Sequence, residues 1–208
     1  VAEAARAFAA IKADRELPTV LVVGESYVRC NPTVNDHVID KLEHAGIRVR
    51  LAPFGEWFEY IDYINRHVLG GSGWSARLNA MVRERIQTRC YDLMAAQLGW
   101  RPRTSVTEAL AAGRSFIRHE LAGEAILTVG VPLHEWRVGL IDGAVSVGPL
   151  ECMPSKIAET QLVHASEREG LPALALPLNG DPIDGEVLDS FVFQVKRNFA
   201  RGRPPSNA

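Results

Sequence analysis

The stretch Thr19-Val-Leu-Val-Val-Gly24 decides the fold that this sequence predicts. It is a short, continuous apolar run rich in β-branched residues, and a glycine ends it. A run of this length without polar alternation is typical of a strand that is buried on both faces, as in a parallel sheet. The sequence therefore predicts a parallel sheet that helices cover on both sides.

The segments that follow this run complete a βαβ unit. Apolar residues at helical spacing predict a helix over 34–45, Gly46 suits its C-cap, and Ile47–Leu51 reads as a second strand. The crossover should be right-handed and the two strands parallel. Further strands are expected at 144–147 and 173–176, and helices at 2–13, 55–68, 75–98, 105–121, 123–139 (kinked at Pro132), 154–169 and 184–199.

These elements predict an α/β fold: a doubly wound, mostly parallel sheet of about four strands in the order 2-1-3-4, flavodoxin-like or Rossmann-like. We expect a single domain over residues 1–208 with a helical insertion at about 55–122. The chain begins with Val1 in place of Met, so we expect a C-terminal fragment of a longer protein.

Composition excludes several classes of protein. Of the 208 residues, 47% are hydrophobic and 23% are charged, which are ordinary globular values and rule out general disorder. The net charge of −2 disfavours nucleic acid as a partner, and the apolar runs are too short for a membrane span. Three cysteines without tight spacing indicate a reducing compartment, so a cytoplasmic location is expected.

A candidate site lies where the loops after the first and third strands meet. In an open α/β sheet, ligands bind beyond the carboxyl ends of the strands, where the strand order reverses. Those two loops carry Glu25, Arg29, Cys30, Glu151 and Cys152. The sequence thus places two of its three cysteines at the expected site.

Cys152 is the most informative of these residues. Pro154 suits the first turn of a helix, so Cys152 should precede a helix N-terminus, which favours the thiolate that a metal or an iron–sulfur cluster requires. The alternative is a small residue that fills a tight loop. Glu25 and Arg29 are expected to grip a polar ligand or to pair with each other. Cys30 is either a second cluster ligand or an ordinary loop residue.

The sequence lacks the common nucleotide-binding motifs. No G-x-G-x-x-G follows the first strand, and no G-x-x-x-x-G-K-[ST] occurs, so neither an NAD site nor an ATP site is expected in this chain. Cys90 lies on a predicted helix of the insertion, where a packing role is expected.

Three segments carry a resemblance to a known family: Val23-Gly-Glu-Ser-Tyr-Val-Arg-Cys-Asn-Pro32, Leu51-Ala-Pro-Phe-Gly-Glu-Trp57 and Gly148-Pro-Leu-Glu-Cys-Met-Pro154. Over residues 19 to 195 the chain resembles the 2-hydroxyacyl-CoA dehydratase / benzoyl-CoA reductase component family. It is most similar to the C-terminal region of fused CoA-substrate-specific enzyme activases, the activators of 2-hydroxyglutaryl-CoA dehydratase.

This resemblance implies a [4Fe–4S] cluster that receives an electron from an ATP-driven activator and serves radical chemistry on an acyl-CoA. Cys152 matches a cluster-ligand position, and Glu25 and Arg29 match the motif after the first strand. Cys30 and Cys90 match no ligand position, and the earlier domain of the dehydratase subunits is absent. Either an omitted segment or a partner chain is therefore expected to supply the remaining ligands, or the domain has kept the fold and lost the cluster.

The function expected from the resemblance is a component of a dehydratase and activase system that contributes to an iron–sulfur cluster or an acyl-CoA pocket and is inactive alone. Its partner would be an acyl-CoA dehydratase or activase domain, and a homodimer is also open. One alternative is a non-catalytic docking domain with an exposed apolar patch around Phe54–Tyr63. Another is a redox or nucleophilic enzyme that uses Cys152, with His134 as a spatial neighbour.

Overall fold

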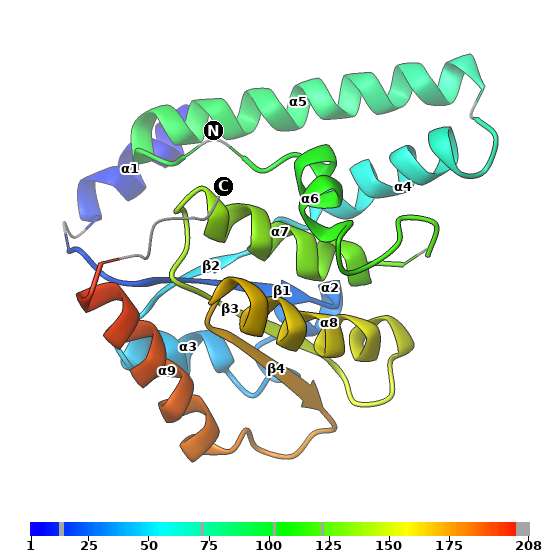
Figure 1. Cartoon of the computed structure of the whole chain (residues 1–208). Coiled ribbons are helices and arrows are strands. Elements are labelled where there is room, and N and C mark those ends of the chain that lie inside the picture. The colour runs from blue at the N-terminus through cyan, green and yellow to red at the C-terminus, as the bar shows by residue number, and fades with distance from the viewer. Residues whose placement is uncertain (13–14, 72, 102, 122, 203–208) are drawn as a thin grey trace. The chain divides into compact units, whose positions relative to one another are not determined.

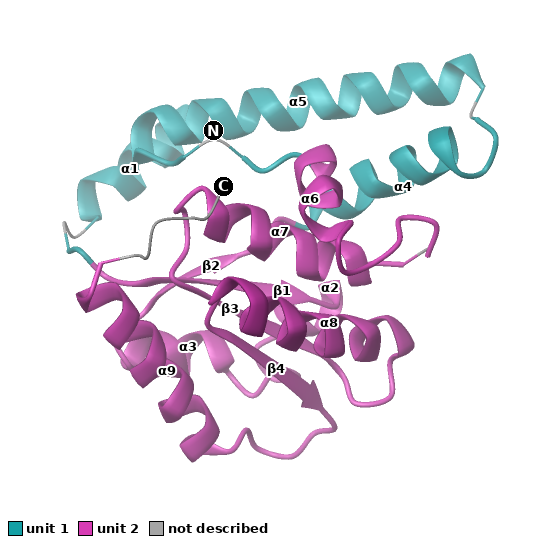
Figure 2. Cartoon of the chain, viewed as in Figure 1, with its two compact units in different colours: residues 1–16, 54–105 teal, residues 17–53, 106–208 magenta. Residues whose placement is uncertain are grey.

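The computed structural model describes residues 1–12, 15–71, 73–101, 103–121 and 123–202. The chain divides into two compact units (Figure 2). The first, which we call the helical unit, comprises residues 1–16 and 54–105, and the second, the sheet unit, comprises residues 17–53 and 106–208. The insertion predicted at 55–122 coincides with the helical unit up to residue 105, whereas residues from Val106 onward belong to the sheet unit. Its predicted last residue, Ala122, lies outside the described residues.

The sheet unit is built on four parallel strands, β1 (Thr19–Gly24), β2 (Arg48–Leu51), β3 (Gly143–Pro149) and β4 (Ala173–Leu178). Their order is β2-β1-β3-β4 (Figure 1), which confirms the predicted fold class and strand order. The two central strands are buried almost throughout, because helices cover both of their faces.

The described residues of this unit form the helices α2 (Ser26–Cys30), α3 (Val38–His44), α6 (Val106–Gly113), α7 (Ala125–Arg137), α8 (Met153–Glu169) and α9 (Gly185–Ala200). Helices α3 and α9 pack on one face of the sheet, and α7 and α8 cover the other (Figure 1). The first face holds a continuous apolar core in which Val20, Val22, Val145 and Val147 meet Phe191.

The helical unit contains α1 (Ala2–Ile11), α4 (Gly55–His67) and α5 (Trp74–Leu98). Both α1 and α4 pack against the long α5. Lys12 Nζ donates to the carbonyl oxygen of Leu98 at 2.9 Å, which holds α1 beside the end of α5. Helix α4 is held by an ion pair between Arg83 and Asp62 and, at 2.5 Å, by one between Arg103 and Glu59.

Two predictions for the segment after β1 were wrong. Residues 26–30 form the short helix α2 where a loop was expected, and the helix predicted over 34–45 begins only at Val38. Local side-chain bonding explains the second difference: the Asn31 carbonyl Oδ1 accepts hydrogen bonds from the backbone of Thr33 and Val34, at 3.1 and 3.3 Å. Such turns compete with helix formation.

The helix predicted over 105–121 is also shorter than expected. Helix α6 ends at Gly113, and the chain then turns back so that Phe116 and Ile117 both donate their backbone N–H to the Gly113 carbonyl at 2.9 Å. The side chain of Ile117 is fully buried. Burial of this isoleucine favours the turn over a longer helix.

Candidate functional site at the carboxyl edge of the sheet

The loops that follow β1 and β3 lie side by side. Glu25 donates its backbone N–H to the Val147 carbonyl at 2.9 Å, and Gly24 stands opposite Val147 in the sheet register. Gly24 has φ +107°, and a Cβ at this position would lie 2.0 Å from the Val147 oxygen. Only glycine therefore allows this approach, which joins the loop that carries Glu25 to the strand that leads to Cys152.

Cys152 occupies the N-cap position of α8, with Met153 and Pro154 in the first turn. Its backbone N–H donates to the Pro149 carbonyl at 3.1 Å, and its own carbonyl accepts from Lys156 at 2.9 Å. The side chain makes no capping hydrogen bond and is half-buried. Cys152 thus stands at the positive end of a 17-residue helix and is a partly exposed residue.

The Glu25 side chain caps the backbone of the helix that follows it. It is the N-cap of α2, and its Oε2 accepts a hydrogen bond from the backbone N–H of Val28 at 2.8 Å. A carboxylate at this position satisfies a donor that would otherwise lack a partner at the start of the helix. The observed role of Glu25 is therefore to form the turn from β1 into α2.

Arg29 is almost fully buried, with 3% of its surface exposed. Its guanidinium donates from Nη1 to the Gly24 carbonyl at 3.2 Å and from Nη2 to the Pro53 carbonyl at 3.5 Å. These two contacts tie the end of β1 to the loop that follows β2. Beside it, Asn35 donates from Nδ2 to the Val28 and Arg29 carbonyls, at 3.0 and 3.2 Å. Arg29 and Asn35 therefore hold the site loops in place.

The other two cysteines lie on other helices than Cys152. Cys30 is exposed at the last residue of α2, and Cys90 is half-buried on α5 of the helical unit. Within the described ranges, no three His, Cys, Asp or Glu side chains converge into a metal site. A [4Fe–4S] cluster is held by four thiolates. Cys152 fits such a cluster as one ligand, and the chain's own thiols do not complete the set.

His134, which the sequence offered as a neighbour of Cys152, lies on α7 and faces α6. Its Nε2 is 4.0 Å from Glu108 Oε1.

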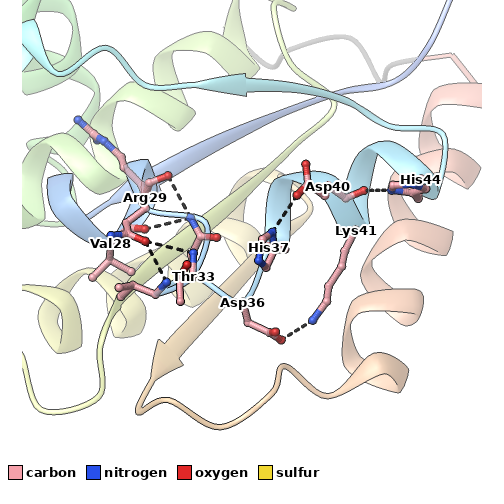
Figure 3. A network of polar contacts seen from close by, with 11 residues as sticks. Val28, Arg29, Thr33, Asp36, His37, Asp40, Lys41 and His44 are labelled. Atoms are coloured by element: carbon pink, nitrogen blue, oxygen red, sulfur yellow. Dashed lines mark hydrogen bonds and ion pairs between the residues drawn. The ribbon is translucent and has the colours of Figure 1, made fainter.

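Sequence reasoning missed a polar network at the start of α3 (Figure 3). The Asp36 carboxylate accepts a hydrogen bond from the backbone N–H of Ile183 at 2.7 Å and forms an ion pair with Lys41. The hydrogen bond from Lys41, together with that from Ile183, lowers the pKa of Asp36 below its ordinary value. Asp36 and His37 both have positive φ, +51° and +53°. The Asp36-His37 pair was the available signal, because aspartate and histidine are enriched in left-handed backbone.

Three exposed apolar side chains accompany the site residues along the chain. Tyr27 lies in α2, Leu150 follows β3, and Met153 opens α8. Leu150 donates its backbone N–H to the Leu178 carbonyl at 2.9 Å, which attaches this loop to the end of β4. The edge of the sheet that carries Cys152 therefore presents apolar as well as polar surface.

Among the helices that the structure describes, none has the length and apolar character needed to cross a lipid bilayer. Comparisons of the chain with protein-family models, with curated proteins and with solved structures found no match.

Proposed function

We propose that this chain is a region of a CoA-substrate-specific enzyme activase, or of a related 2-hydroxyacyl-CoA dehydratase component. In this role Cys152 contributes one thiolate to a [4Fe–4S] cluster whose other ligands come from outside these 208 residues. The proposal rests on the three segments that resemble this family. The observation that carries it is the position of Cys152, a partly exposed residue at the N-terminus of α8, at the edge of the sheet where Glu25 bonds to the end of β3.

The surroundings of Cys152 suit a thiolate ligand. The first turn of α8 presents backbone N–H groups without helical partners, and the helix dipole favours negative charge at this end. Pro154 fixes the helix start, because its ring sets φ and its missing N–H costs nothing there. When bound, the cluster would supply single electrons for chemistry on an acyl-CoA.

Glu25 and Arg29 act in this proposal as positioning residues. Glu25 forms the turn into α2, and Arg29 fixes that turn against the Gly24 and Pro53 carbonyls. The Arg29 contacts hold the end of β1 beside the loop after β2, and the Glu25 backbone N–H, which donates to the Val147 carbonyl, holds the loop after β1 against β3, the strand that leads to Cys152. The other ligands and the acyl-CoA would approach Cys152 at this edge of the sheet.

The test is anaerobic purification of the natural polypeptide that contains this chain, followed by measurement of iron and acid-labile sulfide. In Cys152→Ser we expect loss of most of the iron and sulfide relative to the wild type, whereas Cys30→Ser and Cys90→Ser retain both. Serine is a favoured N-cap residue, so Cys152→Ser keeps the start of α8 intact. Equal iron in the wild type and in Cys152→Ser would remove Cys152 from the ligand set.

A further inference from the structure

Helix α5 of the helical unit presents a stripe of exposed apolar side chains. The stripe consists of Trp74, Leu78, Met81, Val82 and Ile86, whose exposed fractions lie between 44% and 80%. Within α5, which has 25 residues, Ala80 is the buried residue. The helix therefore directs a second apolar surface away from the one that its own unit uses.

The spacing of this stripe is that of a buried helix face. Its residues follow one another at i, i+4, i+7, i+8 and i+12, so they lie on one side of the helix. The exposed part of Trp74 alone, at 80% exposure, comes to about 200 Å². With the other four side chains the stripe offers roughly 500 Å² per copy, near the low end for a specific interface. Apolar surface of this kind marks an interaction site.

Two opposite charges stand on one flank of the stripe. Arg77 and Glu84 are seven residues apart, two turns of the helix, and neither forms an ion pair with another described residue. Both line an open hollow of about 640 Å³, together with Trp74, Leu78, Met81 and, from α4, Arg66. The hollow thus has an apolar floor and a charged rim of both signs.

We propose that the stripe is the interface with a second copy of this chain, in which the two α5 helices pack antiparallel about a two-fold axis near Ala80 and Met81. A two-fold interface brings the same patch of both copies together. In an antiparallel pair, one flank faces the same flank of the partner, so Arg77 of one copy meets Glu84 of the other, twice. The apolar stripe and the charges on its flank are therefore both complementary to the same surface of a second copy.

The antiparallel direction follows from the arginines that continue the stripe. Arg85 and Arg89 lie on the same side of α5 as the apolar residues, closer to its C-terminal end. A parallel pair would place Arg85 beside Arg85 of the second copy, and Arg89 beside Arg89. Like charges at that spacing repel. An antiparallel pair places them near Trp74 of the partner, where a guanidinium stacks favourably on the indole.

The first experiment measures mass by sedimentation over a range of concentrations. The wild type should approach twice 22.8 kDa, about 46 kDa. The double variant Leu78→Glu/Val82→Glu should raise the dimer Kd about 100-fold or more, because it buries four carboxylates in the interface. Both positions are exposed, so circular dichroism should show an unchanged fold. Val163→Glu, an equally exposed apolar position on α8, is the control and should leave the dimer intact.

The second experiment tests the direction of pairing. Arg77→Glu and Glu84→Arg should each weaken the dimer, because each places two like charges opposite each other. The combined variant Arg77→Glu/Glu84→Arg should restore the wild-type Kd within about twofold. A wild type that stays at 22.8 kDa at its highest soluble concentration would overturn the proposal, as would a dimer that tolerates Leu78→Glu/Val82→Glu. Failure of the charge swap to restore the dimer would overturn the antiparallel arrangement.

Discussion

The sheet unit and the helical unit use their apolar residues in opposite ways. In β1 every residue after Thr19 is buried, and in β3 every residue before Pro149 is buried. In α5 the reverse holds, since Ala80 is its buried residue and the large apolar side chains of its first half face outward. The sheet unit therefore buries most of the apolar residues of its central strands in a core, whereas α5 of the helical unit presents its large apolar side chains at the surface.

This difference indicates where the stability of the chain lies. Burial of a valine, leucine or isoleucine side chain contributes about 1.5–3 kcal/mol, and the sheet unit contains most of the fully buried ones. Helices with few buried contacts open at lower free energy than the strands of a core. We therefore expect substitutions in the sheet unit to lower the free energy of unfolding far more than matched substitutions in α5 or its flanks.

The largest difference in the free energy of unfolding is expected between alanine substitutions at two glycines, one in each unit. Gly24→Ala would force a Cβ to within 2.0 Å of the Val147 carbonyl oxygen, at a φ of +107° that alanine resists. We expect a loss of about 4 kcal/mol in the free energy of unfolding, measured by urea denaturation. Gly73→Ala, before α5, meets nothing within 4 Å and should cost about 0.5 kcal/mol or less. Equal effects would show that the two units do not differ as proposed.

The next largest difference in the free energy of unfolding is expected between alanine substitutions at two leucines, one in each unit. Leu162 on α8 is fully buried, and Leu162→Ala should lower the free energy of unfolding by about 3 kcal/mol through lost burial and a residual cavity. Leu78 on α5 is almost half exposed, and Leu78→Ala should change this quantity by about 0.5 kcal/mol when measured on the monomer at low concentration. A loss of more than about 2 kcal/mol at Leu78 would place it in a core.

These contrasts also explain which parts of the fold could be predicted. The two central strands could be predicted from Thr19–Val23 and the later apolar run, because strands buried on both faces are largely apolar. The late start of α3 could not be predicted in the same way. It depends on Asn31 Oδ1, which bonds to two backbone groups, and on the left-handed residues Asp36 and His37. Hydrophobic periodicity does not report such bonds.

The candidate site also has features that could be predicted from local sequence and features that could not. The position of Cys152 before a helix followed from Pro154, a local signal that the structure confirms. The partners of Arg29 are the Gly24 and Pro53 carbonyls, and Pro53 is 24 residues away in the sequence. A contact of that kind depends on how β1 and β2 lie beside each other, which no short motif encodes. The ligand role of Cys152 stays a prediction.

A smaller effect on the free energy of unfolding is expected at Asp36, whose carboxylate bonds to Lys41 and to the Ile183 N–H in the sheet unit. Asp36→Asn removes the ion pair with Lys41 and weakens the bond to the Ile183 N–H, so we expect a loss of about 1.5 kcal/mol at neutral pH. The folded pKa of Asp36 lies below its unfolded value. This stabilisation is therefore present above about pH 4 and is lost as the pH falls through the folded pKa.

Denaturation of the wild type and Asp36→Asn, compared from about pH 7 down to about pH 2.5, measures this effect. The difference between the two proteins should shrink toward acid. Asp40→Asn is the matched control, since Asp40 is more exposed and pairs with His37 at the surface. It should cost about 0.5 kcal/mol or less at neutral pH. A wild-type advantage over Asp36→Asn that stays constant to the lowest pH would contradict the role assigned to Asp36.

The smallest effect separates two ion pairs of nearly equal exposure, one in each unit. In the sheet unit, Arg137 donates from Nε and Nη2 to both carboxylate oxygens of Glu169, and this bonding raises the pKa of Arg137. In the helical unit, Arg83 donates to one oxygen of Asp62. The exposed fractions of the two arginines are 39% and 38%. Geometry is therefore the variable that distinguishes the pairs.

Double-mutant cycles with alanine should give a coupling of about 1 kcal/mol for Arg137 with Glu169 and about 0.5 kcal/mol or less for Arg83 with Asp62. Arg137→Lys should lose most of the larger coupling, because an ammonium cannot reproduce the two parallel bonds. Arg83→Lys should change the coupling to Asp62 little, since a single contact to one carboxylate oxygen needs only a point charge. Equal couplings in the two cycles would mean that bonding geometry adds nothing at this exposure, and would confine the contrast between the units to apolar burial.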